Sequence, residues 1–147
     1  MKNNTIEDED NHSILTTLIL NNSELNVVGI HLRNSMHQAD YNLAIKGMEH
    51  LKTLVQNING NLIVIGDLNM TPASKRFTNF LKETNLFTYT SYKQPTSTWP
   101  SFLPDLFGIE IDHVLFSKNF KIINKNIINN FGSDHSLLMV DLAYVGD

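Results

Sequence analysis

The hydrophobic and polar positions in the first half of the chain follow strand and helix periods in turn. Residues 14–20 and 25–30 are apolar and β-branched, and the polar residues 21–23 between them are a turn signal, so this pair predicts a β-hairpin. Apolar residues then recur at helical spacing over 40–58, which predicts an amphipathic helix. Residues 62–65 are apolar throughout, as expected for a strand that is covered on both faces.

The second half predicts a short helix, a long loop and more strands. Ser74 can cap a helix that carries Phe77 and Phe80 on one face. Residues 87–108 contain three of the four prolines and show no clear period, so they predict a long surface loop of the kind that often has a function. Three further strands are predicted at residues 109–117, 121–128 and 136–142. The resulting order of strands and helices is a mixed α/β layer.

Length and composition narrow the class of protein. The 147 residues fit one domain, with 41% hydrophobic and 18% charged residues, as in ordinary globular chains. The net charge of −4 and the lack of a basic run argue against a protein that binds by broad neutralisation of phosphates. The chain has no cysteine, which excludes disulfides and thiolate zinc sites.

The first residues predict a short tail rather than a targeting signal. Residues 1–12 are polar and acidic and lack the basic and apolar regions of a secretory signal, so we expect a disordered lead-in before a domain at 13–147. No stretch approaches the roughly 18 apolar residues of a membrane span. We therefore expect a cytoplasmic location.

Polar residues that could take part in catalysis or binding occur at the ends of the predicted strands, where α/β folds place their functional sites. These residues have the side chains needed to bind a divalent metal, activate water and hold a phosphate oxygen. They are His31, Asp67, Asn69, Asp112, Asp134 and His135. Taken singly, each also fits a turn residue, a helix cap or a solvated histidine.

The residue types indicate separate roles. Asp67 can act as a general base or metal ligand, and Asn69 can donate to a phosphate oxygen or to the attacking water. His135 can bind metal or hold the phosphate as an imidazolium, with Asp112 orienting a histidine through its other ring nitrogen. His31 can donate a hydrogen bond to the phosphate. Asp134 can bind the metal.

A different metal site is a further alternative. In it, His113 and His135 join Asp112 and Asp134 as the ligands of another kind of hydrolase. This alternative makes His113 a ligand, so a His113→Ala titration would distinguish it from the site above.

Four motifs in order resemble a known family. They are Val27-Val28-Gly29-Ile30-His31-Leu32, Ile65-Gly66-Asp67-Leu68-Asn69, Ile111-Asp112-His113-Val114-Leu115 and Gly132-Ser133-Asp134-His135. Together they resemble the C-terminal half of the endonuclease/exonuclease/phosphatase (DNase I-like) superfamily, over nearly the whole chain. Thr98-Trp99-Pro100 is similar to a bacterial subgroup of that superfamily.

The resemblance implies a fold and a set of roles. The fold would be half of a four-layer α/β sandwich, with one mixed, mostly antiparallel sheet, helices on one face and the other face bare and apolar. Asp67 would activate water beside Asn69, and His135 would contact the phosphate with Asp112 as its carboxylate partner. Asp134 would help Asp67, Asn69 and His135 to hold Mg²⁺ or Mn²⁺, and His31 would stabilise the phosphate charge.

The resemblance also implies a function and its alternative. The function would be metal-dependent hydrolysis of a phosphodiester or phosphomonoester, in a nucleic acid, a phospholipid or an inositol phosphate. The family's principal glutamate ligand has no counterpart, since none of Glu7, Glu9 or Glu24 has a matching context. The metal would then bind weakly, in a truncated chain that dimerises or pairs with a separate N-terminal half. The alternative is an inactive lobe that serves in binding or assembly, or a gene fragment.

Overall fold

The computed structural model describes residues 2–8, 11–20, 22–34, 38–89, 96–129 and 132–146. Its elements are β1 (Lys2–Asp8), β2 (Asn11–Leu20), β3 (Ser23–His31), α1 (Gln38–Gln56), β4 (Asn61–Asp67), α2 (Lys75–Thr84), β5 (Phe87–Thr88), the 3₁₀ helix η1 (Asp105–Phe107), β6 (Asp112–Phe116), β7 (Phe120–Ile128) and β8 (Leu137–Tyr144). The predicted hairpin, both helices and the later strands are confirmed within a few residues. Part of the predicted long loop, residues 90–95, lies outside the described residues.

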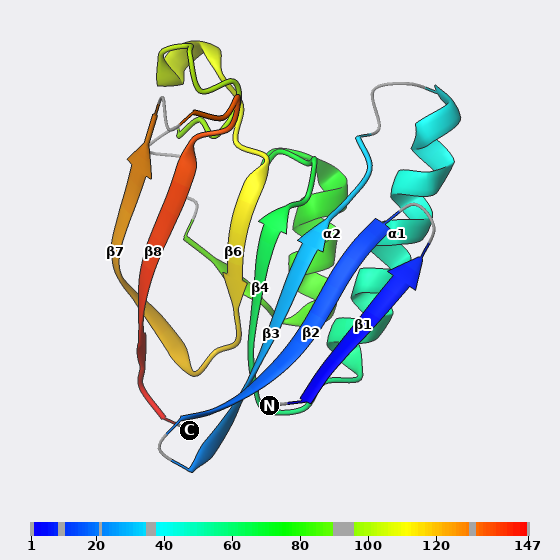
Figure 1. Cartoon of the computed structure of the whole chain (residues 1–147), viewed down its shortest axis with the longest axis vertical. Helices are drawn as coiled ribbons and strands as arrows, with labels where there is room; N and C mark the ends of the chain where they lie inside the picture. Colours follow the sequence, from blue (N-terminus) through cyan, green and yellow to red (C-terminus); the bar gives the residue numbers. More distant parts are fainter. Residues whose placement is uncertain are drawn as a thin grey trace.

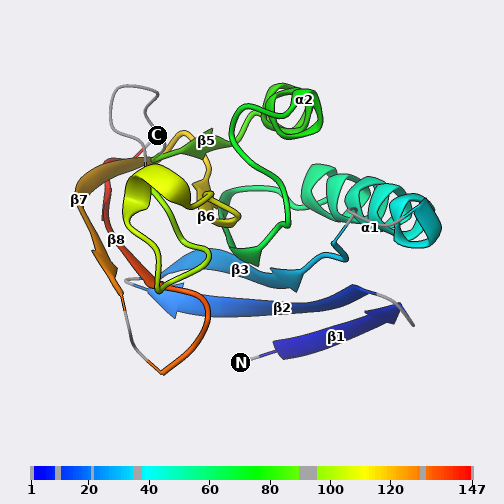
Figure 2. The ribbon, with the colours of Figure 1, turned by 90° about the horizontal axis from the view of Figure 1, so that it is seen from above.

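The main sheet has six strands in the order β1-β2-β3-β4-β6-β5. Strands β3 and β4 run parallel, and every other neighbouring pair is antiparallel. Helices α1 and α2 both cover the same face of this sheet (Figures 1 and 2). The predicted fold class, a mixed and mostly antiparallel sheet with helices on one face, is therefore confirmed.

Strands β7 and β8 form a second, two-stranded sheet instead of extending the first. Strand β5 pairs with the outer edge of β6, so part of that edge is already occupied. The β7–β8 ribbon stands beside the main sheet and is turned out of its plane (Figure 2). This second sheet is a difference from the single sheet that was predicted.

The prediction of a disordered lead-in is wrong for residues 2–8. These residues form β1, which pairs with β2 from Lys2 opposite Thr17 to Asp8 opposite Asn11. The physical reason is that the outer edge of β2 would otherwise present unpaired N–H and C=O groups. A neighbouring segment can form backbone hydrogen bonds with these groups, whatever side chains that segment carries. Residues 1, 9 and 10 of the predicted lead-in lie outside the described residues.

The core lies between the main sheet and the two helices. Side chains on alternate positions of the central strands point toward the helices, as the period of a strand requires. Val28, Val64 and Leu115 from β3, β4 and β6 are fully buried there, against Leu51 of α1 and Phe77 of α2. Among the described residues, neither helix has the length and apolar character needed to cross a membrane.

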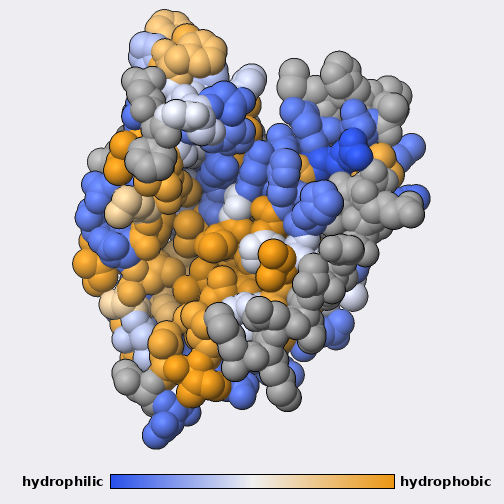
Figure 3. All heavy atoms as spheres, in the orientation of Figure 1, coloured by the Kyte–Doolittle hydropathy of each residue, from blue (hydrophilic) through white to orange (hydrophobic). Residues whose placement is uncertain are grey.

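The opposite face of the main sheet is apolar and open, as predicted. Ile14, Gly29, Ile65 and Val114 lie side by side in the register of four strands. Ile14 is 54% exposed and Ile65 is 40% exposed. Figure 3 shows apolar residues gathered in the hollow between this face and the β7–β8 ribbon. An exposed apolar area of this kind is typical of an interaction surface.

Candidate active site

The strand register brings three predicted residues into one row. His31 lies opposite Asp67 in the β3–β4 pair, and Asp67 lies opposite Asp112 in the β4–β6 pair. Because β3 and β4 are parallel and β6 is antiparallel to them, two strand ends and one strand beginning meet at the same edge (Figure 1). The register therefore brings these three candidate residues together at one edge of the sheet.

Asn69 holds the Asp67 carboxylate in place. The backbone N–H of Asn69 donates to Asp67 Oδ1 at 2.7 Å, and its side-chain Nδ2 donates to Asp67 Oδ2 at 3.1 Å. The same Nδ2 donates to the carbonyl of Leu32 at 2.8 Å. The amide hydrogens thus point inward, so Asn69 positions Asp67 here instead of offering a donor to the phosphate. Its backbone φ of 49° is one that asparagine tolerates better than most residues.

His135 pairs with Asp112 across two distant parts of the sequence. His135 Nδ1 lies 2.8 Å from Asp112 Oδ2, so Nδ1 is the ring nitrogen that donates to this carboxylate. Partial burial acts to lower the pKa of His135, but the hydrogen bond and charge of Asp112, with the charges of Asp67 and Asp134, outweigh it and raise the pKa. The pair therefore favours an imidazolium, which is one of the two roles that the residue types left open for His135.

Asp67 is the most enclosed acid of the row. Burial raises the pKa of its carboxyl group, the Asn69 backbone hydrogen bond lowers it, and the charge of Asp112 raises it again. The charges of His135 and His31 act in the lowering direction, and the net shift is upward. His31 Nε2 is 3.8 Å from Asp67 Oδ2 and its side chain is largely exposed. A raised pKa makes Asp67 a better proton acceptor.

Asp67, Asp112 and His135 form a group that could hold a metal. One ligand atom from each lies within 4.8 Å of the others. Two carboxylates suit Mg²⁺ or Mn²⁺, which prefer oxygen ligands and are often bound by one or two carboxylates together with substrate phosphate. The chemistry of the donor set therefore fits the expected ion.

Asp134 does not lie in this group, although the resemblance implied that it helps to hold the metal. Its side chain is exposed, and its Oδ2 accepts a hydrogen bond from Trp99 Nε1 at 3.3 Å. Asp112 occupies the place in the group that Asp134 was expected to take. Trp99 thus anchors its loop to the turn before β8.

No glutamate joins the group in the part of the chain that the structure describes. Glu24 lies near the start of β3, at the other end of the strand from His31. Glu110 is buried and accepts a hydrogen bond from Thr96 Oγ1.

The alternative site with His113 as a ligand is contradicted. His113 follows Asp112 in β6, so its side chain points to the opposite face and is buried. Its Nε2–H donates to the carbonyl of Met70 at 2.8 Å, and its ring lies 4.4 Å from that of Phe77. Burial lowers the pKa of His113 against opposing contributions from the Met70 hydrogen bond and from Glu110 and Asp112. His113 is a core residue that supports the turn after Asn69.

The part played by Thr98 was not predicted from the sequence. Its buried Oγ1 accepts hydrogen bonds from the backbone N–H groups of Ile111 at 3.0 Å and Asp112 at 3.1 Å. Its carbonyl accepts one from the N–H of Ser136 at 2.8 Å. Thr98 therefore joins the start of β6 to the turn that carries His135, and positions both members of the pair. The only signal was the Thr98-Trp99-Pro100 motif in an otherwise irregular loop.

Replacing Thr98 by valine is expected to weaken both stability and the site. Valine keeps the shape but removes the acceptor for two backbone N–H groups, which costs about 1–3 kcal/mol in free energy of unfolding. Urea denaturation measures that loss, and any phosphodiesterase turnover should fall with it because Asp112 shifts. Ser97→Ala is the matched control, since that buried hydroxyl donates to the carbonyl of Trp99 within its own loop. Equal effects in the two variants would contradict a positioning role for Thr98.

Solved structures with the same fold are found at low sequence identity. The human Nocturnin catalytic domain with bound sulfate has a TM-score of 0.71 and 20% identity, over 98% of this chain and 59% of that one. An endonuclease/exonuclease/phosphatase from Beutenbergia cavernae has a TM-score of 0.73 and 17% identity, over 92% and 40%. A Staphylococcus aureus beta toxin mutant with bound magnesium has a TM-score of 0.58 and 16% identity, over 91% and 57%.

These likenesses show the fold, and the chain spans 40–59% of the length of the three structures. No curated protein matches the sequence. The sequence pattern of the Endonuclease/Exonuclease/phosphatase family matches residues 6–135, most of the chain. That match includes all four motifs that meet at the edge of the sheet. The chain belongs to the endonuclease/exonuclease/phosphatase family.

Proposed function

We propose that the chain is a metal-dependent phosphoesterase that hydrolyses a phosphodiester or phosphomonoester. The observation that carries this proposal is the group of Asp67, Asp112 and His135, whose ligand atoms lie within 4.8 Å of one another at one sheet edge. Membership of the family supports the same reaction class. The magnesium bound to the beta toxin supports the choice of metal.

Asp67 is the candidate base. Its raised pKa and its fixed orientation suit it to take a proton from water while the water oxygen bonds to phosphorus. The bond from phosphorus to the leaving ester oxygen then breaks, and that oxygen takes up a proton from solvent. Asp67 and Asp112 would hold Mg²⁺ or Mn²⁺, which would neutralise charge on the phosphoryl oxygens when bound.

His135 is the candidate phosphate contact. Asp112 holds its Nδ1 and favours the imidazolium, so Nε2–H can donate to a phosphate oxygen as negative charge develops there. His31, at the end of β3, would supply a second and more exposed donor. The phosphoester group on which these residues would act is common to the three candidate substrates, which are nucleic acid, phospholipid and inositol phosphate.

A second candidate function is that of an inactive lobe used in binding or assembly. The absence of a glutamate from the group, among the described residues, favours it, because a site with fewer carboxylates binds Mg²⁺ less tightly. The open apolar face of the main sheet also favours it. Turnover measured directly separates this candidate from the phosphoesterase.

The test is hydrolysis of bis-p-nitrophenyl phosphate by the purified chain, with Mg²⁺ or Mn²⁺ and again with a chelator. We expect turnover that requires the metal and is lost by at least about 100-fold in Asp67→Asn, which keeps the shape but removes the base. The control is Asp141→Asn, an exposed acid of β8 away from the site. Turnover absent from both the wild type and Asp67→Asn would support the inactive lobe, and turnover that is equal in the two would contradict Asp67 as the base.

A further inference from the structure

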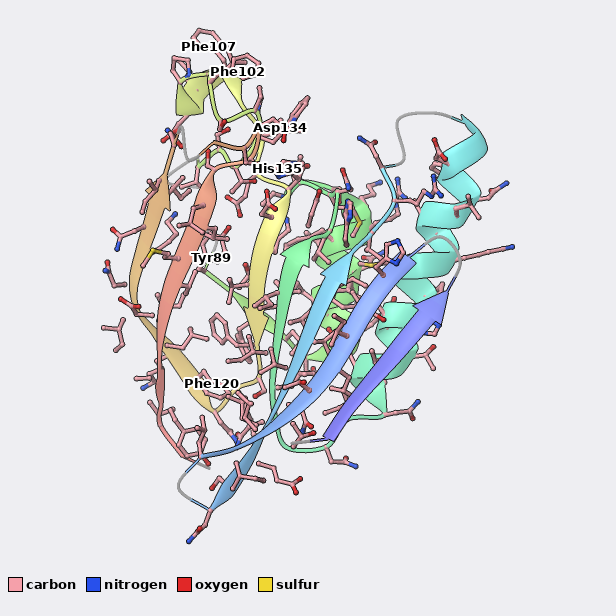
Figure 4. The ribbon with its side chains drawn as sticks, viewed as in Figure 1. Tyr89, Phe102, Phe107, Phe120, Asp134 and His135 are labelled. Carbon is pink, nitrogen blue, oxygen red and sulfur yellow. The ribbon has the colours of Figure 1, made fainter. Side chains whose placement is uncertain are left out.

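An apolar protrusion stands on the same edge of the molecule as the candidate site. It is the turn around η1, and its exposed side chains are Phe102, Leu103, Leu106 and Phe107, here called the apolar tip. Phe102 and Phe107 are each 71% exposed, and Leu106 is 79% exposed. Figure 4 shows Phe102 and Phe107 at the far end of the turn, with Asp134 and His135 below them.

The apolar tip is held to the site by several hydrogen bonds. Ser101 N–H donates to the carbonyl of Asp134 at 2.7 Å, and Ser101 Oγ donates to the carbonyl of Ser133 at 2.6 Å. On the other side of the turn, Trp99 and Ile109 pair through their backbones. The tip therefore keeps its position relative to His135, and whatever binds the tip is brought next to the site.

The charges around the tip are few and acidic. No lysine or arginine occurs between residues 94 and 117. Asp105 is the one charged residue among positions 101–109, and Glu110 is buried. A surface of this kind has no electrostatic attraction to an anionic partner. Transfer of its exposed aromatic and leucine side chains out of water is favourable in free energy.

We propose that the apolar tip inserts into the surface of an uncharged or zwitterionic lipid layer and so presents the candidate site to phosphodiesters at headgroup level. The η1 turn projects beyond the ends of β6 and β8 (Figure 1), which suits insertion between lipids better than packing against a flat protein surface. Trp99 lies at its base with its indole N–H bound to Asp134, a position typical of aromatic residues at a lipid–water interface. The consequence for substrate choice rests on the proposed phosphoesterase function.

Binding to vesicles tests the proposal without any turnover. The probe is phosphatidylcholine vesicles, and the readout is co-sedimentation of the wild type and of the double variant Phe102→Ser/Phe107→Ser. We expect the partition coefficient of the double variant to fall by about tenfold or more, because two large apolar side chains no longer enter the lipid. Ile123→Ser is the matched control, since Ile123 on β7 is 68% exposed but lies outside the tip. It should bind like the wild type.

Trp99 provides a second readout because it is the single tryptophan of the chain. Its fluorescence should shift to shorter wavelength when vesicles are added to the wild type, and should stay unchanged in the double variant. Binding should also be insensitive to salt and no stronger with anionic lipid, as the charges predict. Circular dichroism of the double variant verifies that it folds.

Several outcomes would overturn the proposal. They are no binding by the wild type, equal binding by the double variant, or binding that needs anionic lipid and disappears with salt. Self-association that the double variant abolishes, without vesicle binding, would make a second copy the occupant of the tip. Asp67→Asn should bind vesicles normally, and the double variant should keep any turnover of the soluble ester. Failure of lipid binding and failure of the proposed function are therefore measured separately.

Discussion

His135→Ala is expected to lower kcat/KM for bis-p-nitrophenyl phosphate by about 1,000-fold. The variant loses the group that would face the phosphate, and Asp112 is left as a partly buried carboxylate without the ring that lies 2.8 Å away. Loss of one preorganised donor to a developing oxyanion costs on the order of 10²–10³ in rate, and the unpaired acid adds to that loss. Steady-state kinetics with saturating Mn²⁺ measures the effect. His50→Ala, which removes an exposed histidine of α1, is the control.

Asp112→Asn tests whether the two residues act as a unit. Asparagine cannot favour the imidazolium, so this variant should lose about 100-fold on its own. The double variant His135→Ala/Asp112→Asn should be slower than His135→Ala alone, but by less than the about 100-fold loss of Asp112→Asn, because Asp112 would act partly through the ring and partly as a metal ligand. Losses that multiply fully in the double variant would show that Asp112 acts independently of the ring, as a metal ligand alone. A loss no larger than that of His50→Ala would contradict the assigned role of His135.

Gly66→Ala is expected to cause the largest loss of stability. Gly66 has a φ of 140°, which side chains rarely adopt, and an added Cβ would lie 1.9 Å from the carbonyl oxygen of Ile30. That oxygen belongs to the backbone of β3, so it cannot move without breaking the β3–β4 pairing that aligns His31 with Asp67. Strain and overpacking together should cost about 3 kcal/mol or more in free energy of unfolding. Urea denaturation followed by circular dichroism gives the value.

Gly29→Ala is the matched control for this prediction. Gly29 is in the neighbouring strand, adjacent to Ile30, and an added Cβ there meets nothing within 4 Å. Its substitution should change the free energy of unfolding by less than about 1 kcal/mol. If Gly66→Ala were as stable as Gly29→Ala, the close approach of β4 to Ile30 would not be a constraint on the fold.

The sequence by itself determined the elements and the kinds of side chain at their ends. The periods over residues 25–30, 40–58 and 62–65 are local, and each is visible in a short window because one face must be apolar. The polar residues that follow such runs, Asp67 and His135 among them, could be identified because strand ends are where side chains meet solvent and substrate. The resemblance of the motifs to the family added the prediction that Asp112 is the carboxylate partner of His135.

Only the tertiary structure decided which of these residues meet. The register of β4 with β6 sets Asp112 beside Asp67, while the bond from Trp99 takes Asp134 out of the group. Strand β1 forms because β2 has a free edge, a property that no pattern within residues 2–8 reveals. Thr98 acts through contacts 13 and 14 residues away. Periodicity reports what one segment needs to bury, whereas register and long-range hydrogen bonds depend on where the other segments lie.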